Sequence, residues 1–184
     1  STTQVGALSS TQLNRLTTAQ VAGLSTGNLK AIGTGALQGV STTQLNALSS
    51  TQVQALTSVQ VQALTSNQLN NMNTTQVGFL SSAQAQVLSS NQLNALDDAA
   101  LQAIETADLR AMSTTQIAGL SSVQLNALTS VQLQALGSGQ LMALTGSQIN
   151  ALNSNSVTAL GSSYIPTLSS SQVSLLSTAQ LNDL

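Results

Sequence analysis

Four carboxylates lie close together in the sequence and are the residues best able to do chemistry: Asp97, Asp98, Glu105 and Asp108. Carboxylate oxygens bind hard cations such as Ca²⁺, and a repeat fold that stacks its turns can bring two such pairs together. The sequence has no spaced D-x-D-x-D-G loop of the calcium-binding kind. Carboxylates also stabilise helix N-termini, where the helix dipole favours negative charge. Helix capping is therefore the preferred interpretation, and the four residues are cation candidates beside it.

Most other kinds of site are excluded by composition. The chain has neither histidine nor cysteine, which excludes serine–histidine and cysteine–histidine nucleophiles and the usual zinc sites. The glycine-rich stretch GTGALQG, residues 33–39, lacks the Lys-Ser/Thr of a phosphate-binding loop. A net charge of −2 offers no basic patch to a nucleic acid. We therefore expect no enzyme activity, no cofactor and no nucleic-acid partner.

The elements that position these side chains follow an eight-residue repeat. The 184 residues divide into 23 octads without insertion or deletion, with the consensus [S/T]-[S/T]-x-Q-[L/V]-x-A-L. Position 5 is Leu, Val or Ile in 22 octads, position 8 is always apolar, and position 7 is Ala or Gly in 16. Such a fixed period is typical of a solenoid. Two apolar columns and two variable columns, at positions 3 and 6, indicate an inside and an outside.

Neither a long helix nor a flat strand fits this period. Eight residues turn an α-helix about 80° past a whole number of turns, so an apolar stripe would spiral around it. In a strand, positions 5 and 8 would point to opposite faces. The chain must therefore turn a corner in every octad.

The first half of each octad has the signature of a helix start. Position 1 is Ser, Thr, Asn, Asp or Gly in 22 octads, which is the N-cap set. Gln at position 4, found in 17 octads, completes a capping box. We predict an all-α solenoid of 23 short capped helices joined by tight corners. The alternative is a β-solenoid with Ser/Thr corners, but Leu at position 5 and Ala at position 7 suit a helix better.

Two further predictions concern the column residues. Gln at position 4 either caps only its own helix or also bonds the backbone of the adjacent corner in a ladder. Position 1 also follows the preceding helix, so its Gly and Asn residues suit a left-handed C-terminal cap: Gly33, Asn73, Gly137, Asn153 and Gly161.

Two further octads contain residues that depart from the pattern. Phe79 occupies the small column and is expected as a large-for-small exchange within the core. In GSSYIPTL, residues 161–168, Tyr164 replaces Gln, and Pro166 must shorten or distort the helix because it lacks an N–H. Tyr164 is read as a local irregularity, with ligand stacking as the alternative.

No apolar run approaches the roughly 18 residues of a membrane span, so no membrane insertion is expected. The N-terminal octad STTQVGAL lacks the regions of a signal peptide. Both terminal octads resemble internal ones. We therefore expect residues 1–184 to be a single solenoid excerpted from a longer array, contacting flanking repeats and able to associate end to end.

The octads STTQLNAL, SSVQLNAL and TSVQLQAL resemble octapeptide arrays in very large secreted or surface proteins of Gram-negative bacteria, some of them adhesins associated with repeat-in-toxin modules. The resemblance implies an extracellular or cell-surface location and a role as a spacer or stalk. One alternative is a protein- or glycan-binding module that uses positions 3 and 6. Another is an ice-binding hydroxyl array, although Thr occupies position 2 in only nine octads.

Overall fold

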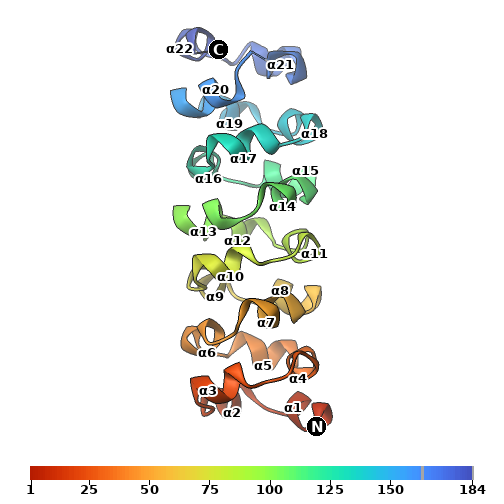
Figure 1. Ribbon diagram of the computed structural model, residues 1–184. Helices are drawn as coiled ribbons and strands as arrows, with labels where there is room; N and C mark the ends of the chain where they lie inside the picture. Colours follow the sequence, from red (N-terminus) through yellow and green to blue (C-terminus); the bar gives the residue numbers. More distant parts are fainter. Residues whose placement is uncertain (163, 184) are drawn as a thin grey trace. The chain divides into compact units, whose positions relative to one another are not determined.

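The computed structural model describes residues 1–162 and 164–183, and every regular element in that part of the chain is a helix. The all-α prediction is therefore confirmed and the β-solenoid alternative is wrong. Each octad forms one short helix (Figure 1), as follows: α1 (Thr2–Gly6), α2 (Ser10–Asn14), α3 (Thr18–Ala22), α4 (Thr26–Ala31), α5 (Thr34–Gln38), α6 (Thr42–Asn46), α7 (Ser50–Ala55), α8 (Ser58–Ala63), α9 (Ser66–Asn70), α10 (Thr74–Gly78), α11 (Ser82–Ala85), α12 (Ser90–Asn94), α13 (Asp98–Ala103), α14 (Thr106–Ala111), α15 (Thr114–Ala118), α16 (Ser122–Ala127), α17 (Ser130–Ala135), α18 (Ser138–Met142), α19 (Gly146–Asn150), α20 (Ser154–Leu160), the 3₁₀ helix η1 (Ile165–Thr167), α21 (Ser170–Val173) and α22 (Thr178–Asn182).

The predicted capping boxes begin most of these helices. In α7, the hydroxyl of Ser49 accepts a hydrogen bond from the Gln52 N–H at 3.3 Å, and Gln52 Oε1 accepts one from the Ser49 N–H at 2.8 Å. Two of the orphan N–H groups at this helix start are thereby satisfied. Four to seven residues are too few for a stable isolated helix, so these helices depend on the packing of one turn of the solenoid on the next.

The corner between octads is made by two extended residues. Leu56, at position 8, has φ −59° and ψ 135°, and Thr57, at position 1, has φ −69° and ψ 155°. Among the described residues a positive φ occurs at Gly161 alone, where φ is 62° but ψ is −173°, so the predicted left-handed helical cap is not formed there. The prediction is also wrong at the other four positions, which are extended N-caps of the following helix: Gly33, Asn73, Gly137 and Asn153. Position 1 belongs to the helix that it begins.

The chain divides into two compact units, Ser1–Ile104 and Glu105–Leu184, and the octad pattern runs through both. Within each unit a helix packs on the helix three octads later, as α1 does on α4 and α14 does on α17 (Figure 1). Hydrogen bonds from side chains to the backbone of a neighbouring turn join residues 25 to 31 positions apart. One turn of each solenoid therefore takes between three and four octads.

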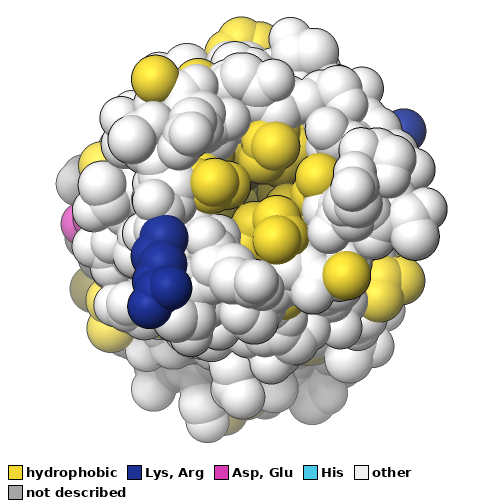
Figure 2. All heavy atoms as spheres, turned by 90° about the horizontal axis from the view of Figure 1, so that it is seen from below, with side chains coloured by type: hydrophobic (Ala, Val, Ile, Leu, Met, Phe, Trp, Pro, Cys, Tyr) yellow, Lys and Arg dark blue, Asp and Glu magenta, His cyan; other side chains and the backbone are white. Residues whose placement is uncertain are grey.

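The core of each unit consists of the apolar side chains of positions 5 and 8. Val53, Leu93 and Leu125 have no exposed surface, and most other members of the two columns are buried. Figure 2 shows the end of the first turn, where hydrophobic side chains fill the centre of a ring of polar surface. Leu8 and Leu16 in this turn are only half-buried, because no other turn lies against that side of them in the 184-residue chain.

The small column at position 7 faces the adjacent turn rather than the core. A Cβ atom added at Gly39 would lie 2.5 Å from the Cβ of Ser10, three octads earlier. The prediction that Phe79 is a core residue is wrong, since 43% of its surface is exposed. Among the residues that the structure describes, no helix is long and apolar enough to cross a bilayer.

Candidate functional site

The most regular polar feature of both units is the glutamine column at position 4. Gln68 shows its geometry: Oε1 accepts from the Thr65 N–H at 2.9 Å, while Nε2 donates to the carbonyls of Leu37 at 2.9 Å and Val40 at 2.8 Å. The oxygen of the amide therefore caps its own helix and the nitrogen bonds the preceding turn. The two roles that the sequence left open as alternatives coexist in one side chain.

The hydrogen bonds from the glutamine nitrogen to the preceding turn recur along both units. Each amide nitrogen reaches carbonyls 28 to 31 residues earlier in the chain, in Gln44, Gln52, Gln60, Gln76, Gln84, Gln92, Gln140, Gln148, Gln172 and Gln180. The exposed Gln12 and Gln20 of the first turn cap only their own helices. An amide offers both an acceptor and two donors, whereas a carboxylate only accepts. This difference explains the choice of Gln over Glu in the column.

Asparagine at position 6 forms a second bridge between turns, which the sequence analysis missed. Asn46 Nδ2 donates to the Asn71 carbonyl at 2.7 Å, and its Oδ1 accepts from the Asn73 N–H at 3.0 Å. Asn14 and Asn126 bond the following turn in the same way. Asn recurs at position 6 in seven octads. That recurrence is the feature of the sequence from which this bridge could have been predicted. These side chains are engaged within the fold, not presented to a partner.

The four carboxylates fall into different units, Asp97 and Asp98 in the first and Glu105 and Asp108 in the second. Asp97 caps α13, since its Oδ1 accepts from the Ala100 N–H at 2.8 Å. Glu105 stands at the N-cap of α14 without a side-chain capping bond. Asp98 is exposed and Asp108 is buried in the glutamine column. Within the described residues, no group of three or more Asp, Glu, His or Cys side chains is placed to hold a metal ion.

Tyr164 interrupts the glutamine column in the second unit. Pro166 predicts a short or distorted helix, and the described residues of this octad form only the 3₁₀ helix η1. The Tyr164 side chain is 3% exposed, and its hydroxyl has no hydrogen-bond partner among the described residues. Burial raises the pKa of Tyr164 to about 12. A buried, unsatisfied hydroxyl costs on the order of 1–3 kcal/mol, so this octad is a weak point of the array.

We expect the substitution Tyr164→Phe to stabilise the chain by about 1 kcal/mol, because it removes a buried hydroxyl that lacks a partner. The wild type should also lose stability as the pH rises from 10 to about 12, since its only tyrosine ionises more easily unfolded than folded. Urea unfolding across this pH range, followed by circular dichroism, measures both effects. A Phe variant that is less stable at neutral pH, or that shows the same alkaline loss, would contradict the prediction.

The comparison with curated proteins found no similar sequence. The model of one repeat family, the ALTTAQ repeat, matches three segments in tandem, residues 29–66, 61–98 and 101–138, which together cover more than half of the chain. The six letters of that name, taken as residues, correspond to octad positions 7, 8, 1, 2, 3 and 4, as in ALSSTQ at residues 47–52. They span the end of one helix, the corner and the capping box of the next. The chain belongs to the ALTTAQ repeat family.

Proposed function

We propose that the chain is a structural spacer within a large secreted or surface protein and that it has no enzymatic activity. The observation that carries the proposal is the uniform bonding between turns. Glutamine amides in both units join carbonyls at the same offsets of 28 to 31 residues, with no insertion in any octad. A segment whose turns are interchangeable in this way sets a distance between the elements that flank it. The secreted or surface location rests on the resemblance to octapeptide arrays.

The spacer role predicts that length scales with the number of octads. Residues 41–96 comprise seven octads of the first unit, or about two turns of its solenoid. Helix layers pack about 8–10 Å apart, so deleting them should shorten the longest dimension by about 16–20 Å and leave the cross-section unchanged. Small-angle X-ray scattering measures both quantities, and duplication of the same segment should lengthen the particle by the same amount.

A matched control removes residues 41–92 and so breaks the octad register. We expect this variant to lose helical signal in circular dichroism, because the first turn after the junction is out of register with the turn on which it must pack. A seven-octad deletion that shrinks all dimensions of the particle together would contradict the spacer proposal.

The alternative function, a protein- or glycan-binding module, is supported only by the exposed residues at position 3. Every described residue at this position is exposed, including Val59, Val123 and Val131 at 64%, 67% and 66%. At position 6, the side chains of Asn46 and Asn126 already bond the following turn. Glycan-array binding that is lost on replacing the position-3 residues and kept on replacing exposed Gln residues at position 6 would favour this role. The ice-binding alternative is tested by thermal hysteresis.

A further inference from the structure

The glutamine bonds between turns give both units a direction. In the described residues, the later turn donates through its amide nitrogen and the earlier turn accepts through its carbonyls, as in Gln68 with Val40 and Gln180 with Leu152. A turn with no turn before it therefore keeps unused donors, and a turn with no turn after it keeps unused acceptors. The first and last turns of the chain differ in this way.

The first turn, residues 1–32, has its unused donors on the side away from the second turn, which we call the N-terminal face. Gln12 and Gln20 are exposed, and their amide nitrogens bond no acceptor within the described residues. Leu16 of this turn is only half-buried, and Figure 2 shows hydrophobic side chains at the centre of the face. The N-terminal face thus combines an apolar centre with free N–H donors.

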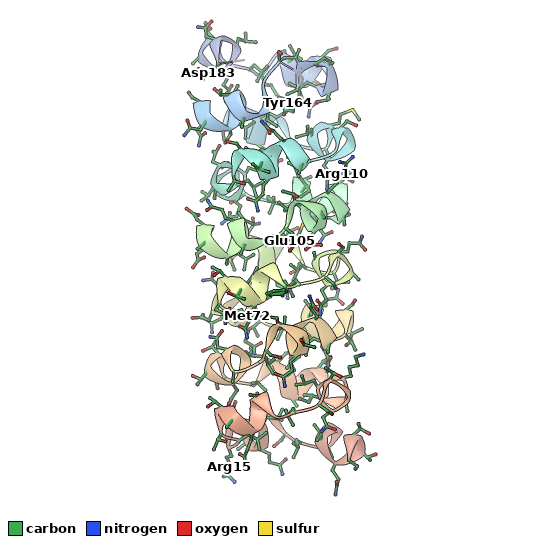
Figure 3. All side chains as sticks on the ribbon, in the orientation of Figure 1. Arg15, Met72, Glu105, Arg110, Tyr164 and Asp183 are labelled. Carbon is green, nitrogen blue, oxygen red and sulfur yellow. The ribbon has the colours of Figure 1, made fainter. Side chains whose placement is uncertain are left out.

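The last turn has its unused acceptors on the opposite side, formed by residues 164–183, which we call the C-terminal face. The carbonyls of Leu168 and Leu176 receive no hydrogen bond within the described residues. Leu181 belongs to the apolar column at position 5, yet it is 51% exposed. Figure 3 labels Asp183, which follows α22 in this turn. The C-terminal face thus combines apolar surface with free carbonyls.

We propose that the N-terminal face binds the C-terminal face of a second copy of the chain, so that copies associate head to tail. The contact continues the packing of one turn on the next that both units already contain. Because 184 residues are a whole number of octads, the register carries over into the second copy. When the numbering is continued, Gln12 of the second copy follows Leu168 by 28 residues, the offset at which glutamines donate to position-8 carbonyls. Gln20 follows Leu176 by the same offset.

The asparagine bridge also continues across this contact. Asn182 stands at position 6, is exposed and bonds no group within the described residues. Asn46 bonds a carbonyl 25 residues later and an N–H 27 residues later. The same offsets lead from Asn182 to the Gly23 carbonyl and the Ser25 N–H of the second copy, and neither group has a partner within residues 1–162 and 164–183.

Only a head-to-tail contact pairs these groups. Two N-terminal faces would set amide donors against amide donors, and two C-terminal faces would set carbonyls against carbonyls. A contact between different faces is heterologous, so it leaves one face of each kind free and can extend to further copies.

Sedimentation velocity of the full chain between about 10 μM and 1 mM tests the proposal over the range of weak association. The sedimentation coefficient should rise with concentration beyond that of a dimer, because each complex keeps two free faces. A wild type that stays monomeric over this range would overturn the proposal and leave other repeats or another protein as the occupant of these faces.

Two blocked variants separate the faces. Gln12→Glu with Gln20→Glu keeps the capping acceptors and removes the amide donors from the N-terminal face. Leu181→Glu places a charge in the apolar part of the C-terminal face. Each variant alone should associate at least about tenfold more weakly than the wild type. Their equimolar mixture should recover the association but stop at dimers, because each variant keeps the face that the other lacks.

Thr11→Glu with Ala19→Glu is the matched control, since it adds the same charges to the same octads at exposed position 3. This variant should associate like the wild type, and circular dichroism of all dilute variants should match the wild type. A blocked variant that associates fully by itself, or a mixture that associates no better than its components, would overturn the head-to-tail contact. The spacer function concerns the length of a single chain, so none of these outcomes bears on it.

Discussion

Replacement of Gln68 by Glu should lower the free energy of unfolding by about 3 kcal/mol or more at pH 7. Gln68 is 3% exposed, and its amide nitrogen donates to two carbonyls of the preceding turn. A carboxylate keeps the capping acceptor, loses both donors and places a buried negative charge beside carbonyl oxygens. Urea unfolding followed by circular dichroism measures the loss.

Gln12→Glu is the matched control for this prediction. Gln12 is exposed and caps only its own helix, and Glu serves equally well in a capping box. Its replacement should change stability by less than about 0.5 kcal/mol. At about pH 4 the Gln68→Glu variant should recover part of its loss, because a buried carboxyl binds its proton more readily folded than unfolded. Equal losses for Gln12→Glu and Gln68→Glu would show that the bond between turns contributes nothing.

Leu93→Ala should destabilise the first unit by about 2–5 kcal/mol, the usual cost of a cavity at a fully buried leucine. Leu93 stands at position 5 and has no exposed surface. Leu181 stands in the same column and is 51% exposed, so Leu181→Ala should cost less than about 1 kcal/mol. Urea unfolding of the two variants and the wild type measures both losses of stability. A small loss at Leu93 would mean that the apolar columns are not the main source of stability.

The local structure could be predicted from the sequence because its causes lie within one octad. The cap residue, the glutamine three positions later and the apolar pair at positions 5 and 8 all act over short separations. The bridges of Asn46 and the donor contacts of Gln68 join different turns. Their partners depend on how many residues complete a turn, and that number follows from the geometry of the corner rather than from any residue type.

The incorrect predictions likewise concern features that the residues of one octad do not determine. Gly33 and Asn73 satisfy the composition of a left-handed cap, yet both are extended N-caps of the next helix. Before Gly33, Ile32 at position 8 already turns the chain in the extended region. The small residues of position 7 predict a core site for Phe79, but that column faces a neighbouring helix, and the Phe79 side chain is partly exposed. The prediction that carboxylates cap these helices is confirmed for Asp97, whose side chain accepts a hydrogen bond from Ala100. The Glu105 side chain makes no such bond.

The fixed offset of the glutamine bonds also constrains the gene. A single inserted codon would displace every glutamine whose bond spans the insertion, whereas gain or loss of eight codons returns each of these glutamines to an equivalent partner. Unequal recombination between repeats produces changes of that second kind. The array can therefore change its reach by common genetic events while each intermediate length still folds, so that length becomes a trait open to selection independently of the fold.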